Sequence, residues 1–369
     1  MRVLHVLGSI ERSGAETMLL SAGGLFSDAG VEMEVVSTGE GRGRLAGAFE
    51  REAIRVHHQP FRKSLRFFLR LAKIVRDGSF DVVHVHTERA ALWIELTARL
   101  VGVKRVVRSV HSAFEFTGWL RVRRTYGRWL SSHLLGVAHI FVSKSVAANE
   151  RSRFGTHGLM IANGIDVNRF VPAGDSSSRS ATRATHRLPM NAIVLISVGR
   201  CTSVKQHDHV LSALSLLVSR IPQLHYIHVG SGPDEESEVA LARRLGVEKC
   251  CRFLGERDDV VGLLQASDIF VMPSQYEGLG IAVLEASACE LPIIAYDVPG
   301  LRDAVVSNVT GLLVKPDVDA LAAAISKLAQ DEEQRKLLGE AGRTMVAGEY
   351  GLGPWVERHV AVYKGVKLR

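Results

Sequence analysis

The sequence predicts an α/β protein built from two domains, each a parallel sheet covered by helices. Its 369 residues are about the length of two ordinary domains, and 46% of them are apolar. Short apolar runs alternate with helical patterns through both halves, which is typical of parallel sheets. Between the halves, residues 171–190 are rich in Ser, Thr and Arg and predict a linker.

The first half, residues 1–170, begins with a strand and a helix. Apolar β-branched runs predict the strands, and amphipathic spacing predicts the helices between them. The predicted strands are residues 2–7, 33–37, 82–85, 105–110 and 139–143, and the first helix is 15–26.

The second half, residues 191–350, repeats this alternation. Its predicted strands are 193–198, 225–229, 251–253, 269–272 and 291–295, and its predicted helices are 207–220, 234–245, 260–265, 281–289 and 318–330. In residues 351–369, Trp355, Val356, Val360 and Tyr363 have helical spacing, so we expect a helix that returns to the first domain.

The net charge of +7 is unevenly distributed. Residues 1–170 hold 25 Lys/Arg and 15 Asp/Glu, a balance of +10, and residues 171–369 hold 21 and 24, a balance of −3. This asymmetry indicates an anionic partner for the first half, with ordinary surface charge as the alternative. A nucleic-acid partner is not expected, because the chain has no recognisable nucleic-acid module and only 6% aromatic residues.

Cysteine usage and hydropathy predict a cytoplasmic protein. The four cysteines have no C-x-x-C pair and no framework spacing, which is typical of reduced thiols. The opening apolar run is too short for a signal peptide, and no run of about 18 apolar residues could span a membrane.

Two glutamates eight positions apart, Glu277 and Glu285, mark the most informative stretch of the chain. Gly278, Leu279 and Gly280 form a predicted turn that opens a helix, whose free backbone N–H groups can bind an anion. Carboxylates on both sides of an anion site suit the hydroxyls of a nucleotide sugar. A helix-terminal carboxylate and a solvated glutamate are the alternative.

Two cations follow the predicted strand 193–198. Arg200 and Lys205 lie in a loop at the strand's carboxyl end, where ligands of open parallel sheets bind. A guanidinium and an ammonium there suit a pyrophosphate, and two solvated loop charges are the alternative.

The E-x7-E stretch resembles the signature of the retaining glycosyltransferases of family 4, whose fold is GT-B. Their G-R-x4-K pattern is similar to the one at Arg200 and Lys205, although Gln206 replaces the usual glycine. "NGID…F" at residues 163–170 also matches. The resemblance covers nearly the whole chain and implies two Rossmann-like domains facing across a deep cleft.

The resemblance also implies roles for single residues. Arg200, Lys205, Gly278, Leu279, Gly280 and Glu285 would bind the donor, as would Gly230, Phe253 and Leu254 near the nucleoside. Glu277 and His111 would be the catalytic residues beside the sugar, and Gly14 would lie in a loop near donor phosphate and acceptor. Without that context, His111 is more simply a structural histidine.

The implied activity is transfer of a sugar, with retention of configuration, from a UDP- or GDP-linked donor to a glycan or polyprenyl-diphosphate-linked acceptor. The opening HVLGSIERSGAETML resembles members that assemble exopolysaccharide and capsule. The alternatives are a GT-B nucleotide-sugar epimerase and a non-catalytic nucleotide-sugar-binding protein. Epimerisation or hydrolysis without an acceptor would favour the epimerase.

No metal and no cofactor are expected. Asp317 and Asp319 form a D-x-D, but their position before an alanine-rich run predicts a helix cap for Asp317. His84 and His86 share one face of a strand, yet no Cys or carboxylate completes a metal site in the sequence.

Two basic stretches of the first half raise the prospect of a membrane partner. Residues 61–76 form a predicted basic amphipathic helix, and Arg121, Arg123, Arg124 and Arg128 are interleaved with Trp119, Leu120 and Trp129. Such patterns bind anionic bilayers, here the inner face of the cytoplasmic membrane, or are ordinary charged helix faces.

Overall fold

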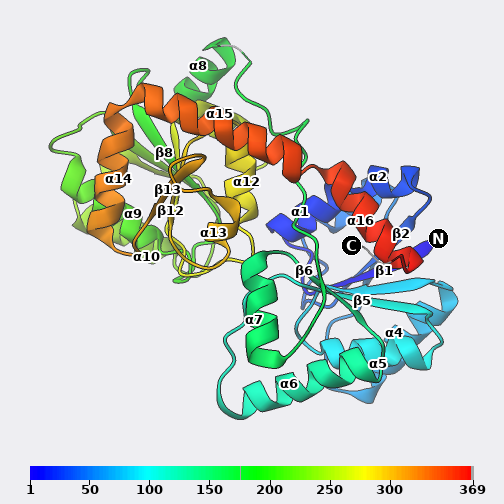
Figure 1. Cartoon of the computed structure of the whole chain (residues 1–369). Helices are drawn as coiled ribbons and strands as arrows, with labels where there is room; N and C mark the ends of the chain where they lie inside the picture. Colours follow the sequence, from blue (N-terminus) through cyan, green and yellow to red (C-terminus); the bar gives the residue numbers. More distant parts are fainter. Residues whose placement is uncertain (175, 367–369) are drawn as a thin grey trace. The chain divides into compact units, whose positions relative to one another are not determined.

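In the computed structural model, which describes residues 1–174 and 176–366 and all their side chains except that of Ser176, the chain divides into two units (Figure 1). Unit 1 combines Met1–Gly164 with the segment that begins at Leu352, and unit 2 is Ile165–Gly351. Each unit is a parallel sheet with helices, which confirms the predicted α/β class.

Unit 1 contains a seven-stranded parallel sheet with the order β3-β2-β1-β4-β5-β6-β7. Its strands are β1 Arg2–Leu7, β2 Glu32–Ser37, β3 Arg55–His58, β4 Val82–Val85, β5 Arg105–Val110, β6 Ala138–Phe141 and β7 Leu159–Met160. Its helices are α1 Gly14–Ser21, α2 Gly23–Asp28, α3 Ala46–Arg51, α4 Leu65–Asp77, α5 Ala91–Leu100, α6 Gly118–His133, α7 Lys144–Phe154 and α16 Leu352–Lys364.

Alternate residues of β1 enter two separate cores, because successive side chains of a strand point to opposite faces. Val3 and Leu7 pack with α1, α2 and the returning helix α16. Leu4 and Val6 pack with α4 and α5 on the other face. The helix predicted from the spacing of Trp355 and its apolar neighbours therefore does return to the first domain, where it completes one of the two cores.

Unit 2 contains a six-stranded parallel sheet with the order β10-β9-β8-β11-β12-β13. Its strands are β8 Ile193–Val198, β9 Leu224–Val229, β10 Cys251–Phe253, β11 Ile269–Met272, β12 Ile293–Tyr296 and β13 Gly311–Val314. Its α-helices are α8 Ser176–Thr185, α9 His207–Leu217, α10 Glu235–Arg244, α11 Val260–Ala266, α12 Ile281–Ala288, α13 Leu301–Ala304, α14 Val318–Gln330 and α15 Glu332–Glu349, with a 3-10 turn at Glu248–Cys250.

Both sheets reverse their strand order once, and that reversal fixes where ligands can bind. The order runs outward in opposite directions from β1 and β4 in unit 1 and from β8 and β11 in unit 2. In open parallel sheets, ligands bind outside the carboxyl ends of the strands at such a reversal. In unit 2 the loops after β8 and β11 carry Arg200 and Glu277.

The linker predicted at residues 171–190 is wrong. Residues 176–185 form α8, which belongs to unit 2, and the chain passes from unit 1 to unit 2 between Gly164 and Ile165. The helix is anchored by charge instead of apolar burial: Arg179 and Arg183 both bind the carboxylate of Asp268, at 2.5 and 2.8 Å. A composition-based reading could not reveal this distant partner.

Three short strands and one helix break escaped the sequence analysis. β3 and β13 are edge strands of four residues, and β7 has only two. The predicted helix 15–26 is two helices that meet at Ala22, and a Cβ on Gly23 would lie 2.7 Å from Ile54 Cδ1. Asp317 does cap α14 through a 2.8 Å bond from Ala320 N, which confirms its predicted helix-cap role.

Candidate active site

In unit 2, the loops that follow β8 and β11 bring Lys205 and Glu277 together. Lys205 Nζ lies 2.5 Å from Glu277 Oε1, and Ser274 Oγ donates to the same oxygen at 2.7 Å. The two charged side chains are 23% and 13% exposed, so the pair is partly accessible and does not lie in the core. The sequence predicted both charged residues, and Ser274 is a third member that it missed.

Backbone contacts hold Glu277 in this position. Gln275 N donates to Val204 O at 2.8 Å, which ties the two loops together, and Glu277 N donates to Pro299 O at 3.0 Å. A Cβ at Gly300, whose φ is +84°, would lie 2.3 Å from Glu277 O. Only glycine therefore lets the loop after β12 pack directly on the backbone of Glu277.

Arg200 lies at the carboxyl end of β8 beside a second close backbone contact. Its side chain is exposed and has no ion pair among the described residues. Gly230 has a φ of +139°, and a Cβ there would lie 2.0 Å from Gly199 O. The loops after β8 and β9 can pack this closely only because position 230 lacks a side chain.

Phe253 and Leu254 line the next loop along the sheet. Both are partly exposed, Leu254 N donates to His228 O at 2.9 Å, and Gly230 N donates to Gly255 O at 2.8 Å. The loops after β8, β9 and β10 thus form one continuous edge, on which Arg200, Gly230 and Phe253 follow each other.

The predicted turn before α12 is present. Gly278, Leu279 and Gly280 are buried, Gly280 caps the helix with a φ of +74°, and the first turn of α12 has free backbone N–H groups suited to an anion. Glu285 lies one turn farther along and has no hydrogen bond among the described residues. Burial raises the pKa of Glu285 to about 7, although Arg169 opposes the shift.

In unit 1, His111 directly follows β5 and ends a chain of hydrogen-bonded imidazoles. His111 Nε2 lies 3.0 Å from His86 Nδ1, and His86 Nε2 lies 2.9 Å from His5 Nδ1. Burial lowers the pKa of His111 to about 4, so its ring is neutral at pH 7. The sequence identified His111 but not the chain behind it.

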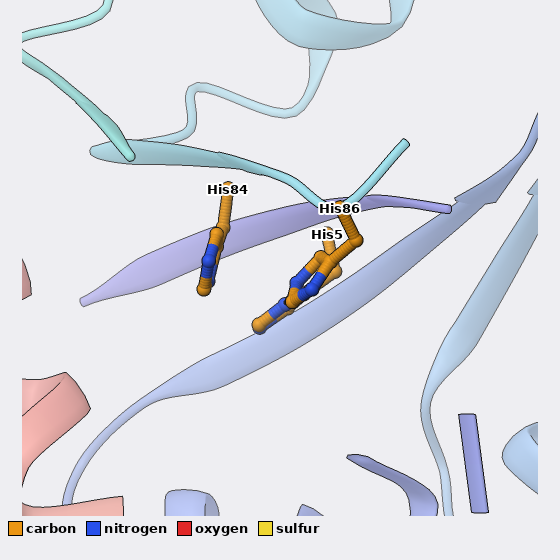
Figure 2. Close-up of side chains that lie close together, drawn as sticks. All are labelled: His5, His84 and His86. Atoms are coloured by element: carbon orange, nitrogen blue, oxygen red, sulfur yellow. The ribbon is translucent and has the colours of Figure 1, made fainter. Parts of the chain in front are cut away.

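His5, His84 and His86 lie together on one side of β1 and β4 (Figure 2). His5 pairs in register with His84, and His86 follows two residues later on the same face. The sequence analysis rejected a metal at His84 and His86 and did not see His5. The ring nitrogens of His84 bond to Tyr363 Oη at 2.7 Å and Ser109 Oγ at 2.8 Å.

Gly14 is the first residue of α1, whose first turn is polar. Ser13 precedes it as the N-cap, and the Ser13 hydroxyl bonds to the carboxylate of Glu16. Burial raises the pKa of Glu16 to about 7. A carboxyl group at this helix N-terminus therefore carries a proton for part of the time at neutral pH.

The candidate site residues of unit 2 have chemistry that suits a single kind of ligand. Arg200, Lys205 and the start of α12 can bind an anion, and Glu277 and Glu285 can accept hydrogen bonds from hydroxyl groups. The predicted donor residues come from the ends of β8, β9, β10 and β11 and from α12. His111 and Gly14 lie in unit 1, at the carboxyl end of β5 and the start of α1.

Comparison with known proteins decides the family. A model described as "Glycosyltransferase Family 4" matches residues 12–169, and "Glycosyl transferases group 1" matches residues 178–345. A Corynebacterium glutamicum protein, the GDP-mannose-dependent monoacylated alpha-(1-6)-phosphatidylinositol monomannoside mannosyltransferase, is 30% identical over 76% of this chain and 75% of its own length. The chain belongs to glycosyltransferase family 4.

A further relative and a solved structure are also similar to this chain. The Escherichia coli UDP-Gal:alpha-D-GlcNAc-diphosphoundecaprenol alpha-1,3-galactosyltransferase is 28% identical over 73% of this chain and 72% of its own length. The crystal structure of Anabaena Alr3699/HepE in complex with UDP-glucose covers 99% of this chain and 100% of its own, with a TM-score of 0.87 and 19% identity. The predicted GT-B fold class is confirmed, and the protein is a glycosyltransferase that uses a nucleotide sugar.

Proposed function

We propose that this glycosyltransferase moves a sugar from a UDP- or GDP-linked donor, with retention of configuration, to a glycan or polyprenyl-diphosphate-linked acceptor in surface polysaccharide assembly. The contact of Lys205 and Ser274 with Glu277, beside Arg200 at the strand reversal of unit 2, carries the proposal. The relatives from C. glutamicum and E. coli, whose names specify lipid-linked substrates, support the acceptor class.

Each donor-site group has a task in this proposal. Arg200, Lys205 and the first turn of α12 bind the pyrophosphate and stabilise the charge that develops as the glycosidic bond breaks. In the free protein Lys205 is held by Glu277, so donor binding exchanges this contact for the phosphate. Glu277 then binds hydroxyls of the sugar, while Glu285, which has no hydrogen bond among the described residues, accepts from the ribose.

The remaining predicted residues complete the site. The loop edge at Gly230, Phe253 and Leu254 contacts the nucleoside, mostly through backbone groups. In unit 1, His111 is a neutral imidazole beside the transferred sugar, and the loop at Gly14 serves phosphate and acceptor. The reaction itself needs no metal and no cofactor, because Arg200, Lys205 and the helix start supply the positive charge.

Thermal denaturation with a series of nucleotide diphosphates and nucleotide sugars tests the donor class, because a bound ligand raises the unfolding temperature by mass action. We expect one base to be preferred. Glu285→Gln should weaken binding of the free nucleotide diphosphate, and Glu277→Gln should weaken only the intact sugar donor. Equal losses in both variants for the free nucleotide would contradict the assignment.

We propose further that α4 and α6 of unit 1 bind an anionic membrane surface where the acceptor lies. Leu65 and Leu69 of α4 are 74% and 61% exposed, and Trp119 and Tyr126 of α6 are 78% and 62% exposed. Large apolar side chains in water beside cations are typical of interfacial helices. No helix within the described residues is long and apolar enough to cross a membrane.

Two arginines of the predicted basic patch do not belong to the proposed membrane-binding surface. Arg128 is only 1% exposed and binds Glu150 at 2.6 Å, and Arg124 lies 3.4 Å from Glu88. Both therefore neutralise carboxylates of the protein. Arg121 and Arg123 are exposed and remain in the patch, as do Arg66 and Arg70 of α4.

Co-sedimentation with vesicles tests this surface. We expect binding to anionic vesicles, not to neutral ones, and weaker binding as salt screens the charges. Arg66→Glu/Arg70→Glu and Trp119→Ser should each reduce it, whereas Arg220→Glu/Lys327→Glu, a matched pair of exposed cations in unit 2, should not. A protein that ignores anionic vesicles at low salt would refute the membrane proposal and leave the donor site untouched.

A further inference from the structure

A second group of potential metal ligands lies in unit 2, under the loop that carries Arg200. Cys201 follows β8, His228 is near the end of β9, and Glu238 belongs to α10. All three side chains are buried, and one potential ligand atom from each lies within 4.8 Å of the others. His207, the first residue of α9, is next to them, with its Nδ1 3.1 Å from Glu238 Oε1.

The hydrogen bonds of His228 leave one of its nitrogens facing an anion. His228 Nε2 lies 3.2 Å from Gly199 O, and a carbonyl can only accept, so Nε2 carries the proton. In a neutral ring the other nitrogen, Nδ1, then has a lone pair. This lone pair is 3.1 Å from Glu238 Oε2.

Glu238 Oε2 is itself an orphan. It is buried and accepts no hydrogen bond among the described residues, even though His228 Nδ1 is so close. A buried carboxylate oxygen without a partner is costly. Two electron-rich atoms at 3.1 Å repel each other unless a proton or a metal ion lies between them.

We propose that Cys201, His228 and Glu238 form a structural zinc site, and that His207, next to the second oxygen of Glu238, orients this carboxylate. Thiolate, imidazole and carboxylate are the ligand types that Zn²⁺ takes in proteins, and tetrahedral Zn–S and Zn–N bonds place neighbouring ligand atoms about 3.3–3.7 Å apart. Here Cys201 Sγ lies 3.7 Å from His228 Nδ1, and His228 Nδ1 lies 3.1 Å from Glu238 Oε2.

The charge of the ligand set also fits a divalent cation. Cys201 is a free cysteine, and its thiol donates to Gly230 O at 3.4 Å. Zn²⁺ displaces the thiol proton, and thiolate and carboxylate together balance its two charges.

Gly199 O accepts the hydrogen bond of the second ring nitrogen of His228. A histidine ligand commonly donates its second N–H to a backbone carbonyl, which fixes the ring. The metal would tie the end of β8, β9 and α10 together, directly beneath Gly199 and Arg200. This role is structural and does not depend on the proposed donor chemistry.

The histidine group of unit 1 does not offer the same site. Both nitrogens of His84 and both nitrogens of His86 already have hydrogen-bond partners. No thiolate or carboxylate accompanies the three rings within the group. We therefore interpret that group as a hydrogen-bonded chain.

Metal analysis of the wild-type protein tests the proposal directly. Purified through a tag that binds no metal, the protein should contain about one zinc per chain. After chelation, Co²⁺ should restore a tetrahedral cobalt spectrum with a thiolate charge-transfer band, and Zn²⁺ should raise the unfolding temperature of the stripped protein.

Variants assign the ligands. Cys201→Ser should lose the charge-transfer band, and Glu238→Gln should lose the thermal response to Zn²⁺. Cys250→Ser, a thiol outside the site, and His5→Asn, from the histidine chain of unit 1, should retain both. The proposal is overturned if the wild-type protein carries less than about a tenth of an equivalent of metal and gives no cobalt band. The cluster would then be a His228 imidazolium paired with Glu238.

Discussion

Replacing Lys205 by Met tests whether this residue serves catalysis more than it serves stability. Methionine keeps most of the side-chain volume but removes the charge that faces Glu277 Oε1 at 2.5 Å. Among the described residues, the Glu277 carboxylate then keeps its hydrogen bond from Ser274. Because the two charged side chains are partly exposed, 23% and 13%, the loss of stability should be modest, about 1–2 kcal/mol, between the values for exposed and buried pairs.

The effect on turnover should be much larger. Loss of one group that stabilises charge in a transition state costs about 2.7–4 kcal/mol, which is roughly 100- to 1,000-fold in kcat. Release of nucleotide diphosphate at saturating donor, with the donor that thermal denaturation selects, measures this directly. The fall in unfolding temperature should be only about 2–8 °C for a unit of this size.

Two further variants complete this experiment. In Lys205→Met/Glu277→Gln the unpaired carboxylate is gone, so stability should recover while turnover stays low. Lys327→Met, an exposed lysine of α14, should leave both unchanged. Turnover of Lys205→Met within about threefold of the wild type would refute the idea that Lys205 neutralises the leaving pyrophosphate.

Three other substitutions test individual features. Gly230→Ala should abolish nucleotide binding, because the new Cβ would lie 2.0 Å from Gly199 O. Gly348→Ala, whose Cβ would meet no atom within 4 Å, should bind nucleotide normally, and isothermal titration measures the affinity of both variants. Glu285→Gln should raise the unfolding temperature at pH 8 but not at pH 5. Burial raises the pKa of Glu285 to about 7, so the wild-type protein loses stability as the pH rises from the unfolded pKa of this group through 7. Unchanged pH dependence would argue against this. Arg128→Ala should lower the free energy of unfolding in urea by about 3–5 kcal/mol, because it leaves the buried Glu150 carboxylate without its ion pair. Arg123→Ala should lower it by less than about 0.5 kcal/mol, and similar losses in both variants would contradict a structural role for Arg128.

The sequence predicted most of the strand pattern because parallel strands buried on both faces are continuous apolar runs, as in β8 and β11. It also identified Lys205, in the loop after a predicted strand, and Glu277, just before a glycine turn. It could not show that they touch, because 72 residues separate them and only the strand order of the sheet brings their loops together.

The failures have a common physical cause. Helix α8 looked like a linker because its stability comes from Asp268, which lies 85 residues from Arg183 along the chain. Arg128 looked like a surface cation because its ion-pair partners, Glu88 and Glu150, are also distant in the sequence. Polar anchoring between distant residues leaves no periodicity in the sequence, whereas apolar burial does.

The return of α16 to unit 1 has a consequence for the order in which the protein can fold. Unit 2 is one continuous segment, Ile165–Gly351, and is complete before α16 is synthesised. Unit 1, although translated first, lacks Trp355, Val356 and Tyr363 until then, and these side chains pack against Phe26 and the face of the sheet that carries the histidines. The nascent first unit therefore emerges from the ribosome with an open apolar face, and a chain that stops at Gly351 would keep it open as a chaperone-binding and aggregation-prone surface.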